Sequence, residues 1–239
     1  RGIKGVRAVI PRIRENLMIE DGCENFCSYC VVPYARGKVQ SKPVNEVITE
    51  AKQFVAAGVR EIILTGINLG VYQFDLSSLV LRLSSINNLI RIRFSSIEPQ
   101  YITDELIKTV AENPKVCKHF HIPLQSGDDE ILKLMNRHYK KEDYLNLIDK
   151  IRKMISDCGI TTDIMVGFPG EGEAEFKNTI DLIEKVQFSR IHIFSYSKRD
   201  LTSASKFPNQ VDAKTKKERY AVLNKLRAKY MKAFAEKYL

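Results

Sequence analysis

Short apolar runs alternate along this chain with longer segments whose apolar residues recur at helical spacing. This alternation is typical of repeated strand–helix units around a parallel sheet. The expected strands are residues 16–20, 61–65, 91–95, 119–123, 161–166 and 191–194. The expected helices are residues 43–57, 76–86, 104–112, 128–135, 142–157, 173–186 and 213–238. Six such units predict an α/β fold, a partial (β/α)6 barrel of the TIM type, because a closed barrel of this type has eight.

The carboxyl ends of these strands predict where the functional site lies. Right-handed crossovers place all of these ends on one rim, and α/β barrels carry their chemistry there. Small residues, carboxylates and amides follow the expected strands repeatedly, at residues 65–66, 95–99, 123–127 and 167–171. We therefore expect these loops to form a binding site.

Composition limits the class of protein. A chain of 239 residues with 44% hydrophobic residues is long enough for one large domain. No run of 18 apolar residues occurs, so no membrane partner is expected. The formal charge of +9 favours an anionic partner, and nucleic acid is the natural candidate. The basic residues of the last helix form either a solvated face or part of a phosphate-binding track.

Three of the five cysteines lie within eight residues, as Cys23, Cys27 and Cys30. This C-x3-C-x2-C spacing brings three thiolates to one point without a fourth ligand. On zinc the missing ligand leaves a catalytic opening, and on a 4Fe–4S cluster it leaves one iron free. A structural zinc site would need a fourth ligand, for which His119 and His121 are available on a distant segment.

The cysteines also indicate the compartment. Disulfides are not expected, because there are few cysteines and no visible signal peptide, which favours the cytoplasm. Cys117 and Cys158 are isolated and are expected to be small core residues.

Two further motifs make a resemblance specific: Ile-Pro-Leu-Gln-Ser-Gly at 122–127 and Val-Gly-Phe-Pro-Gly-Glu at 166–171. With the cysteine loop, they make the chain resemble the radical S-adenosylmethionine (SAM) methylthiotransferases. Residues 21–37, 64–70 and 119–127 are most similar to the MtaB branch, which adds a methylthio group to carbon 2 of threonylcarbamoyl-adenosine next to the tRNA anticodon. The alternatives are the branches acting on isopentenyl-adenosine or on a ribosomal protein aspartate, and a non-catalytic, zinc-bound RNA-binding module.

The resemblance implies cofactors, partners and domains. It implies a 4Fe–4S cluster, SAM that is cleaved reductively at that cluster, an electron donor such as flavodoxin or ferredoxin, and tRNA. Complete members of the family add an N-terminal domain with a second 4Fe–4S cluster and a C-terminal TRAM domain. Residues 1–14 are expected to be a linker from the missing N-terminal domain, and residues 15–239 the radical SAM domain. Full methylthiolation by this fragment alone is therefore not expected.

The resemblance also implies site residues. The cluster ligands are the three clustered cysteines, and the expected SAM contacts lie on the rim loops. These contacts are Tyr29, Thr65, Gly66, Ser95, Ser96, Glu98, Gln125, Arg137, Gly167, Pro169 and Gly170. Arg137 is expected to bind the SAM carboxylate, since guanidinium matches carboxylate in two hydrogen bonds; the alternative is a solvated arginine at a helix end.

Asp163 lies inside the fifth expected strand and is expected to point into the barrel. A buried carboxylate without a partner is costly, so a partner such as Arg93 or a ligand hydroxyl is expected. No spacing singles out His138 or His192, and neither is given a role.

Overall fold

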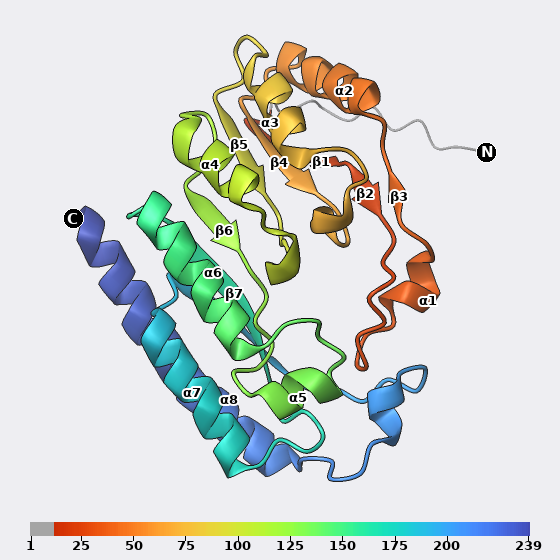
Figure 1. Cartoon of the computed structure of the whole chain (residues 1–239), viewed down its shortest axis with the longest axis vertical. Coiled ribbons are helices and arrows are strands. Elements are labelled where there is room, and N and C mark those ends of the chain that lie inside the picture. Colours follow the sequence, from red (N-terminus) through yellow and green to blue (C-terminus); the bar gives the residue numbers. More distant parts are fainter. Residues whose placement is uncertain (1–11) are drawn as a thin grey trace.

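Six parallel strands form the centre of the computed structural model, which describes residues 12–239 (Figure 1). They are β1 (Arg14–Met18), β4 (Glu61–Thr65), β5 (Arg91–Phe94), β6 (His119–His121), β7 (Gly159–Val166) and β8 (Arg190–Ser195). Parallel ladders join β1 to β4 and β4 to β5, and likewise β6 to β7 and β7 to β8. Isolated parallel bridges, Ile92 to Val116 and Ser96 to His121, connect the two halves.

The strands therefore follow one another in chain order, and the expected partial (β/α)6 barrel is confirmed. Within the described residues β1 and β8 do not pair, so the sheet curves without closing.

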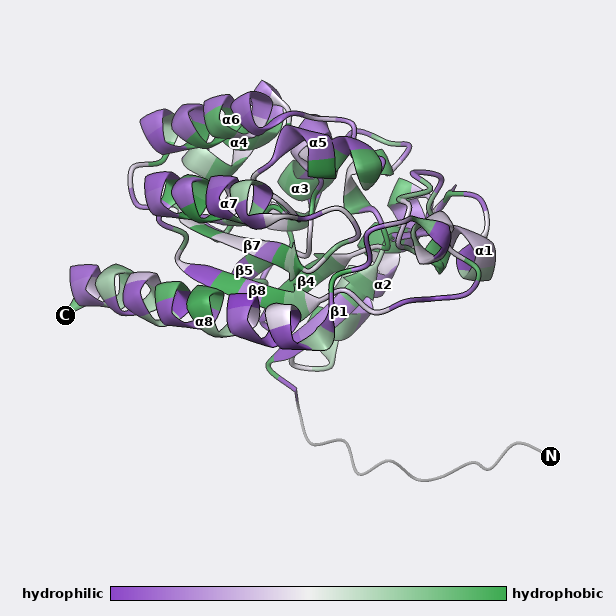
Figure 2. Ribbon diagram, turned by 90° about the horizontal axis from the view of Figure 1, so that it is seen from below, coloured by the Kyte–Doolittle hydropathy of each residue, from purple (hydrophilic) through white to green (hydrophobic). Residues whose placement is uncertain are grey.

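A layer of helices covers the outer face of this sheet (Figures 1 and 2). It consists of α2 (Val44–Ala56), α3 (Leu76–Ser84), α4 (Asp104–Glu112), α6 (Lys141–Met154), α7 (Glu173–Val186) and α8 (Ala213–Ala235). Each packs against the next in chain order. Two short helices, α1 (Val32–Arg36) and α5 (Asp129–Leu134), lie at the carboxyl end of the barrel instead.

Helix α4 shows why the sequence folds locally as expected. The Thr103 side chain caps it by accepting a hydrogen bond from the Leu106 N–H at 3.2 Å. Asp104 and Glu105 in the first turn favour the positive end of the helix dipole. Its apolar face is buried. The helix ends at Glu112, because the proline at position 114 disfavours the helical conformation of the residue before it. Its bounds match the expected ones.

The first expected strand, residues 16–20, differs from the structure. Strand β1 ends at Met18, and a separate β2 (Glu20–Asp21) pairs antiparallel with β3 (Gln40–Ser41). The chain thus leaves the barrel before it enters the cysteine loop, and neither β3 nor α1 was expected. Of the expected linker, residues 1–14, residues 1–11 lie outside the described part of the chain. Its last residue, Arg14, belongs to β1.

The core lies between the sheet and the helices, where alternate strand residues are buried. Cys158 is buried there, as expected, whereas Cys117 is half-buried. None of the helices within residues 12–239 combines the length and apolar character needed to cross a bilayer.

The other strand face lines the barrel interior and is mostly polar. At its amino end the Glu61 carboxylate binds Arg14 at 2.9 Å, Arg91 at 3.2 Å and Arg93 at 3.4 Å. Burial opposes ionisation of Glu61, but the Arg93 hydrogen bond and the charges of Arg14 and Arg93 outweigh it and lower the pKa.

Candidate functional site

The cysteine loop runs from β2 to α1 at the carboxyl end of the barrel (Figure 1). Cys23, Cys27 and Cys30 are half-buried and free of disulfides. The Cys23 N–H donates to the Gly37 carbonyl at 3.1 Å, and the Cys30 N–H to that of Cys27 at 2.9 Å. Gly22 has a φ of +96°, and a Cβ there would lie 2.2 Å from a backbone oxygen. Only glycine allows this curl of the loop.

The surroundings of the three thiols balance burial against hydrogen bonding. Burial raises the pKa of Cys23 and Cys30, and the neighbouring sulfurs raise it further. Two groups oppose this rise at Cys30: the Val32 N–H lies 3.4 Å from its Sγ, and the charge of Arg137, whose Nη1 lies 3.5 Å from Cys27 Sγ, lowers the Cys30 pKa. Such donors stabilise thiolates, the form that binds metal.

The three sulfurs do not lie close enough together to surround a single ion. Four sulfurs on one zinc, with bonds of about 2.3 Å, would lie about 3.8 Å apart. Among residues 12–239, no cysteine belongs to a group of three potential ligands with donor atoms within 4.8 Å of one another. A 4Fe–4S cluster places each thiolate on a different iron and so needs the wider spacing. The donor set therefore fits the cluster, and the zinc alternative lacks a fourth ligand within these residues.

Arg137 connects the cysteine loop to the other rim loops. Its side chain is 4% exposed and forms an ion pair with Glu98, so the alternative of a solvated arginine is wrong. Its Nε donates to the Tyr139 hydroxyl at 3.2 Å, which donates to the Leu124 carbonyl at 2.8 Å. The structure thus brings together the predicted residues Cys27, Glu98 and Arg137.

Tyr29 attaches the cysteine loop to a small apolar cluster formed by Ile131, Met135, Phe168, Tyr196 and Ala204. Its ring meets that of Phe168 edge-on, with centroids 6.3 Å apart. The neighbouring Ser28 is held on both sides, because its N–H donates to the Met135 carbonyl and its carbonyl accepts from the Ala204 N–H.

Beyond β1 and β4, the structure shows a polar group that sequence reasoning missed. The Asn68 N–H donates to Glu20 Oε2 at 2.8 Å, and a Cβ on Gly66 would lie 2.5 Å from that oxygen. Burial raises the pKa of Glu20. The second Glu20 oxygen, both polar side-chain atoms of Asn68 and the Ser95 hydroxyl are buried without a partner. Buried polar atoms normally have partners, so these atoms are candidate hydrogen-bonding groups for a ligand beside Thr65 and Gly66.

The only available signal for Glu20 was a carboxylate at the carboxyl end of the first expected strand, residues 16–20.

Two further predicted SAM contacts, Gln125 and Gly167, have positive φ angles. Gln125 has a φ of +65°, and its N–H donates to the Asp163 carbonyl at 2.8 Å. Gly167 has a φ of +71°, and a Cβ there would lie 2.3 Å from Cγ of Lys216. Packing against α8 is therefore sufficient to require glycine at position 167. Pro169 is buried, whereas Gly170 is exposed.

Arg93, which was named as a possible partner of Asp163, does not bind it. Arg93 binds Glu61, whereas Asp163 binds His121 at 3.1 Å and His192 at 3.3 Å. The register of β7 and β8 sets Asp163 opposite His192, which sequence analysis left without a role. Strand register is a tertiary property, so no local pattern marked this pair.

The basic residues of α8 do not share one environment. Most of its lysines are exposed, but Arg219 is buried and binds Glu171 at 2.7 Å. Lys216 donates to the Tyr196 carbonyl at 3.1 Å. Arg219 thus holds the loop after β7 and Lys216 the segment after β8, so neither belongs to a solvated face or a phosphate track.

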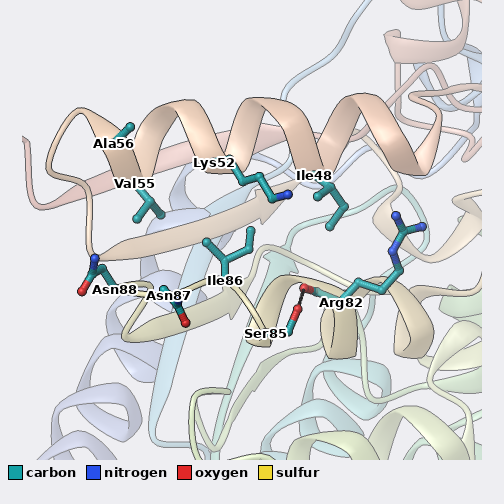
Figure 3. Close-up of a pocket in the computed structure, with 9 residues that line it drawn as sticks. All are labelled: Ile48, Lys52, Val55, Ala56, Arg82, Ser85, Ile86, Asn87 and Asn88. Atoms are coloured by element: carbon teal, nitrogen blue, oxygen red, sulfur yellow. Dashed lines mark hydrogen bonds between the residues drawn. The ribbon is translucent and has the colours of Figure 1, made fainter.

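A surface groove of about 610 Å³ lies elsewhere, between α2 and the loop after α3 (Figure 3). Apolar residues such as Ile48 and Ile86 and the polar ends of Lys52 and Arg82 line it. It belongs to the outer helical layer, and none of the predicted site residues lines it.

Comparisons with known proteins agree with this geometry. The family model of the radical SAM superfamily matches residues 18–183. Over 211 residues the chain is 47% identical to tRNA-2-methylthio-N(6)-dimethylallyladenosine synthase of Caldicellulosiruptor saccharolyticus, covering 86% of this chain and 45% of the relative. Over 217 residues it is 44% identical to threonylcarbamoyladenosine tRNA methylthiotransferase MtaB of Thermotoga maritima, covering 89% and 50%.

The chain thus spans about half the length of these curated relatives. Among solved structures, the radical SAM methyltransferase TsrM of Kitasatospora setae, with cobalamin and a [4Fe-4S] cluster bound, superposes with a TM-score of 0.67. The identity is 16%, and the match covers 80% of this chain and 38% of TsrM. At that identity the likeness concerns the fold alone.

Proposed function

Because the chain belongs to the radical SAM superfamily, we propose that it is the radical SAM domain of a tRNA methylthiotransferase. The observation that carries this proposal is the loop of three free thiols closed over the buried Arg137–Glu98 pair. Curated relatives at 44–47% identity, named as tRNA methylthiotransferases, support the substrate class. We propose carbon 2 of threonylcarbamoyl-adenosine as the target, and dimethylallyl-adenosine as the second candidate, because relatives carry both names.

In this proposal Cys23, Cys27 and Cys30 hold a 4Fe–4S cluster, and its fourth iron is left to SAM. When bound, the two cofactors supply a 5′-deoxyadenosyl radical that can attack an unactivated C–H bond. The chain contributes the thiolates and the two donors to sulfur, from Val32 and Arg137. Hydrogen bonds to cluster sulfurs help to set the reduction potential.

The rim residues suit a zwitterionic amino acid such as the methionine part of SAM. That group carries one ammonium and one carboxylate, and Glu98 and Arg137 offer one partner for each. The unpartnered atoms of Glu20, Asn68 and Ser95 offer further hydrogen bonds to hydroxyl or amino groups. The individual assignments of these side chains to parts of SAM, like those of the other predicted contacts, stay predictions.

The wider activity belongs to the complete protein. We propose that a second 4Fe–4S cluster outside this chain is the sulfur source, that flavodoxin or ferredoxin supplies the electron, and that the enzyme meets tRNA in the cytoplasm. The curated relatives are about twice as long as this chain, which leaves room for such a domain.

Iron content tests the cluster. After anaerobic reconstitution the wild-type chain is expected to hold about four irons. Cys27→Ser should lose most of that iron and its brown colour, whereas Cys158→Ser, which changes a buried cysteine of the core, should retain both. Equal iron in the two variants would refute the ligand assignment.

SAM binding tests the rim. Calorimetric titration of the reconstituted protein should show weaker SAM binding for Arg137→Gln, with iron content unchanged. Arg36→Gln is the matched control, because Arg36 lies on α1 beside the same loop but is exposed. If both variants bind SAM like the wild type, Arg137 has no role in SAM binding.

Modified nucleosides test the substrate. Mass spectrometry of tRNA from a strain without the gene should show threonylcarbamoyl-adenosine lacking its methylthio group. The gene for the complete protein should restore the group, and the same gene with Cys27→Ser should not. Loss of the methylthio group from dimethylallyl-adenosine instead would favour the second candidate, and unchanged tRNA would refute both.

A further inference from the structure

Three potential metal ligands meet inside the barrel, on strands that are not part of the cysteine loop. His121 Nε2 lies 3.1 Å from Asp163 Oδ2, and His192 Nδ1 lies 3.3 Å from Asp163 Oδ1. One ligand atom from each residue lies within 4.8 Å of the other two. They come from three adjacent parallel strands, β6, β7 and β8.

These separations suit a small cation. Imidazole nitrogens and carboxylate oxygens bind zinc and similar ions at about 2.0–2.2 Å, so neighbouring ligand atoms lie about 3–3.6 Å apart. The two measured separations, each to a different oxygen of Asp163, fall within that interval. Two histidines and one carboxylate also form the ligand set of many iron and zinc sites that keep open positions.

One histidine of the cluster, His121, has the outer contact expected of a metal ligand. A histidine ligand usually engages its second nitrogen in a hydrogen bond that fixes the ring. His121 Nδ1 lies 2.8 Å from Thr161 Oγ1, which also lies 3.1 Å from His119 Nε2. His192 is 42% exposed, which leaves an entry path for an ion.

Asp163 has no lysine or arginine beside it within the described residues. Among residues 12–239, Asp163 forms ion pairs with the two histidines alone and with no lysine or arginine. Neutral imidazoles provide hydrogen bonds but no positive charge. A divalent ion would supply that charge and bind both rings in their neutral form.

We propose that His121, Asp163 and His192 form a second metal site, which binds one divalent first-row transition ion such as Fe²⁺, Co²⁺ or Zn²⁺. Imidazole ligands favour these ions over Mg²⁺ or Ca²⁺. Three protein ligands leave positions open toward the barrel interior, where an oxygen donor from water or substrate can bind. The site shares no ligand with the cysteine loop, so it stands or falls independently of the proposed function.

Cobalt(II) is the probe for this site in the reconstituted protein. The oxidised 4Fe–4S cluster is diamagnetic, so the electron paramagnetic resonance (EPR) of high-spin Co²⁺ can be observed beside it. One Co²⁺ per chain is expected, with pulsed EPR showing coupling to imidazole nitrogen. Zn²⁺ should displace it, and excess Mg²⁺ should not.

Variants separate this site from adventitious binding. Asp163→Asn, which keeps the size of the side chain, and His192→Asn, at a half-exposed position, should each weaken Co²⁺ binding about tenfold or more. His138→Asn changes an exposed histidine outside the cluster and should leave binding unchanged. Cluster iron and circular dichroism report whether each variant folds.

Two results would overturn the proposal. One is the absence of stoichiometric Co²⁺ in a folded wild-type protein, which would leave a hydrogen-bonded cluster. The other is Co²⁺ binding that is equal in the wild type, Asp163→Asn and His192→Asn.

Discussion

Arg219→Met tests how α8 holds the loop after β7. Arg219 Nη1 donates to Glu171 Oε1 at 2.7 Å and to the Glu171 carbonyl at 2.8 Å. The Glu171 side chain is 1% exposed, and its other charge-stabilising contact is the Gly167 N–H at 2.8 Å. Removing the guanidinium therefore leaves a buried carboxylate with one backbone donor.

The expected cost follows from this burial. Breaking one partner of a buried ion pair costs about 3–5 kcal/mol, mainly because the other charge stays buried without compensation. The remaining Gly167 N–H favours the lower part of that range. The second partner of Arg219, Glu173, is 88% exposed and adds at most about 1 kcal/mol. We expect Arg219→Met to lower the free energy of unfolding by about 3–4 kcal/mol.

Urea denaturation followed by circular dichroism measures this loss. With a slope of about 3 kcal/mol per molar urea, the midpoint should fall by about 1 M. Lys217→Met is the matched control, because Lys217 is exposed on the same helix. Glu171→Gln combined with Arg219→Met should cost less than the sum of the single changes, since the double variant buries no unpaired charge. A loss for Arg219→Met no larger than for Lys217→Met would refute the reasoning.

Three further changes test other parts of the structure. A Cβ on Gly127 would lie 2.6 Å from the backbone of α7, so Gly127→Ala should cost about 1–3 kcal/mol in urea denaturation, whereas Gly159→Ala, with no contact below 3.5 Å, should cost less. Burial, followed by the charges of nearby groups, lowers the pKa of His119 to about 4. Since an unfolded histidine takes up its proton near pH 6.5, the wild type should lose about 1–2 kcal/mol relative to His119→Gln as the pH falls from 6.5 to 5; equal pH profiles would contradict this. Gly66→Ala should displace the Glu20 carboxylate and weaken SAM binding about tenfold in calorimetry without loss of iron, and unchanged affinity would remove Glu20 from the proposed site.

Most of the fold could be predicted because its elements carry their own local signals. The expected bounds of α4 and α7 match the structure, and so do those of β4. Each of these elements has either a clear hydrophobic period or a recognisable residue at its end. The short α1 and the β2–β3 pair were missed, because five-residue and two-residue elements are too short to show a period.

The candidate site divides in the same way. The three cysteines of the cluster loop are close in sequence, so the sequence alone predicts that they act together as ligands. The pairing of Arg137 with Glu98 spans 39 residues, and that of Asp163 with His121 depends on strand register. No local pattern encodes such pairs.

The amino-acid order thus determined which segments become strands and helices, because hydrophobic periodicity and helix caps act over a few neighbouring residues. It also supplied the thiol cluster, whose members lie on one short loop. Packing and register decided the rest: which rim side chains meet, that Arg219 is buried, and that two histidines from separate strands share one carboxylate. These outcomes depend on contacts between residues distant in the chain, which form only when the whole barrel is assembled.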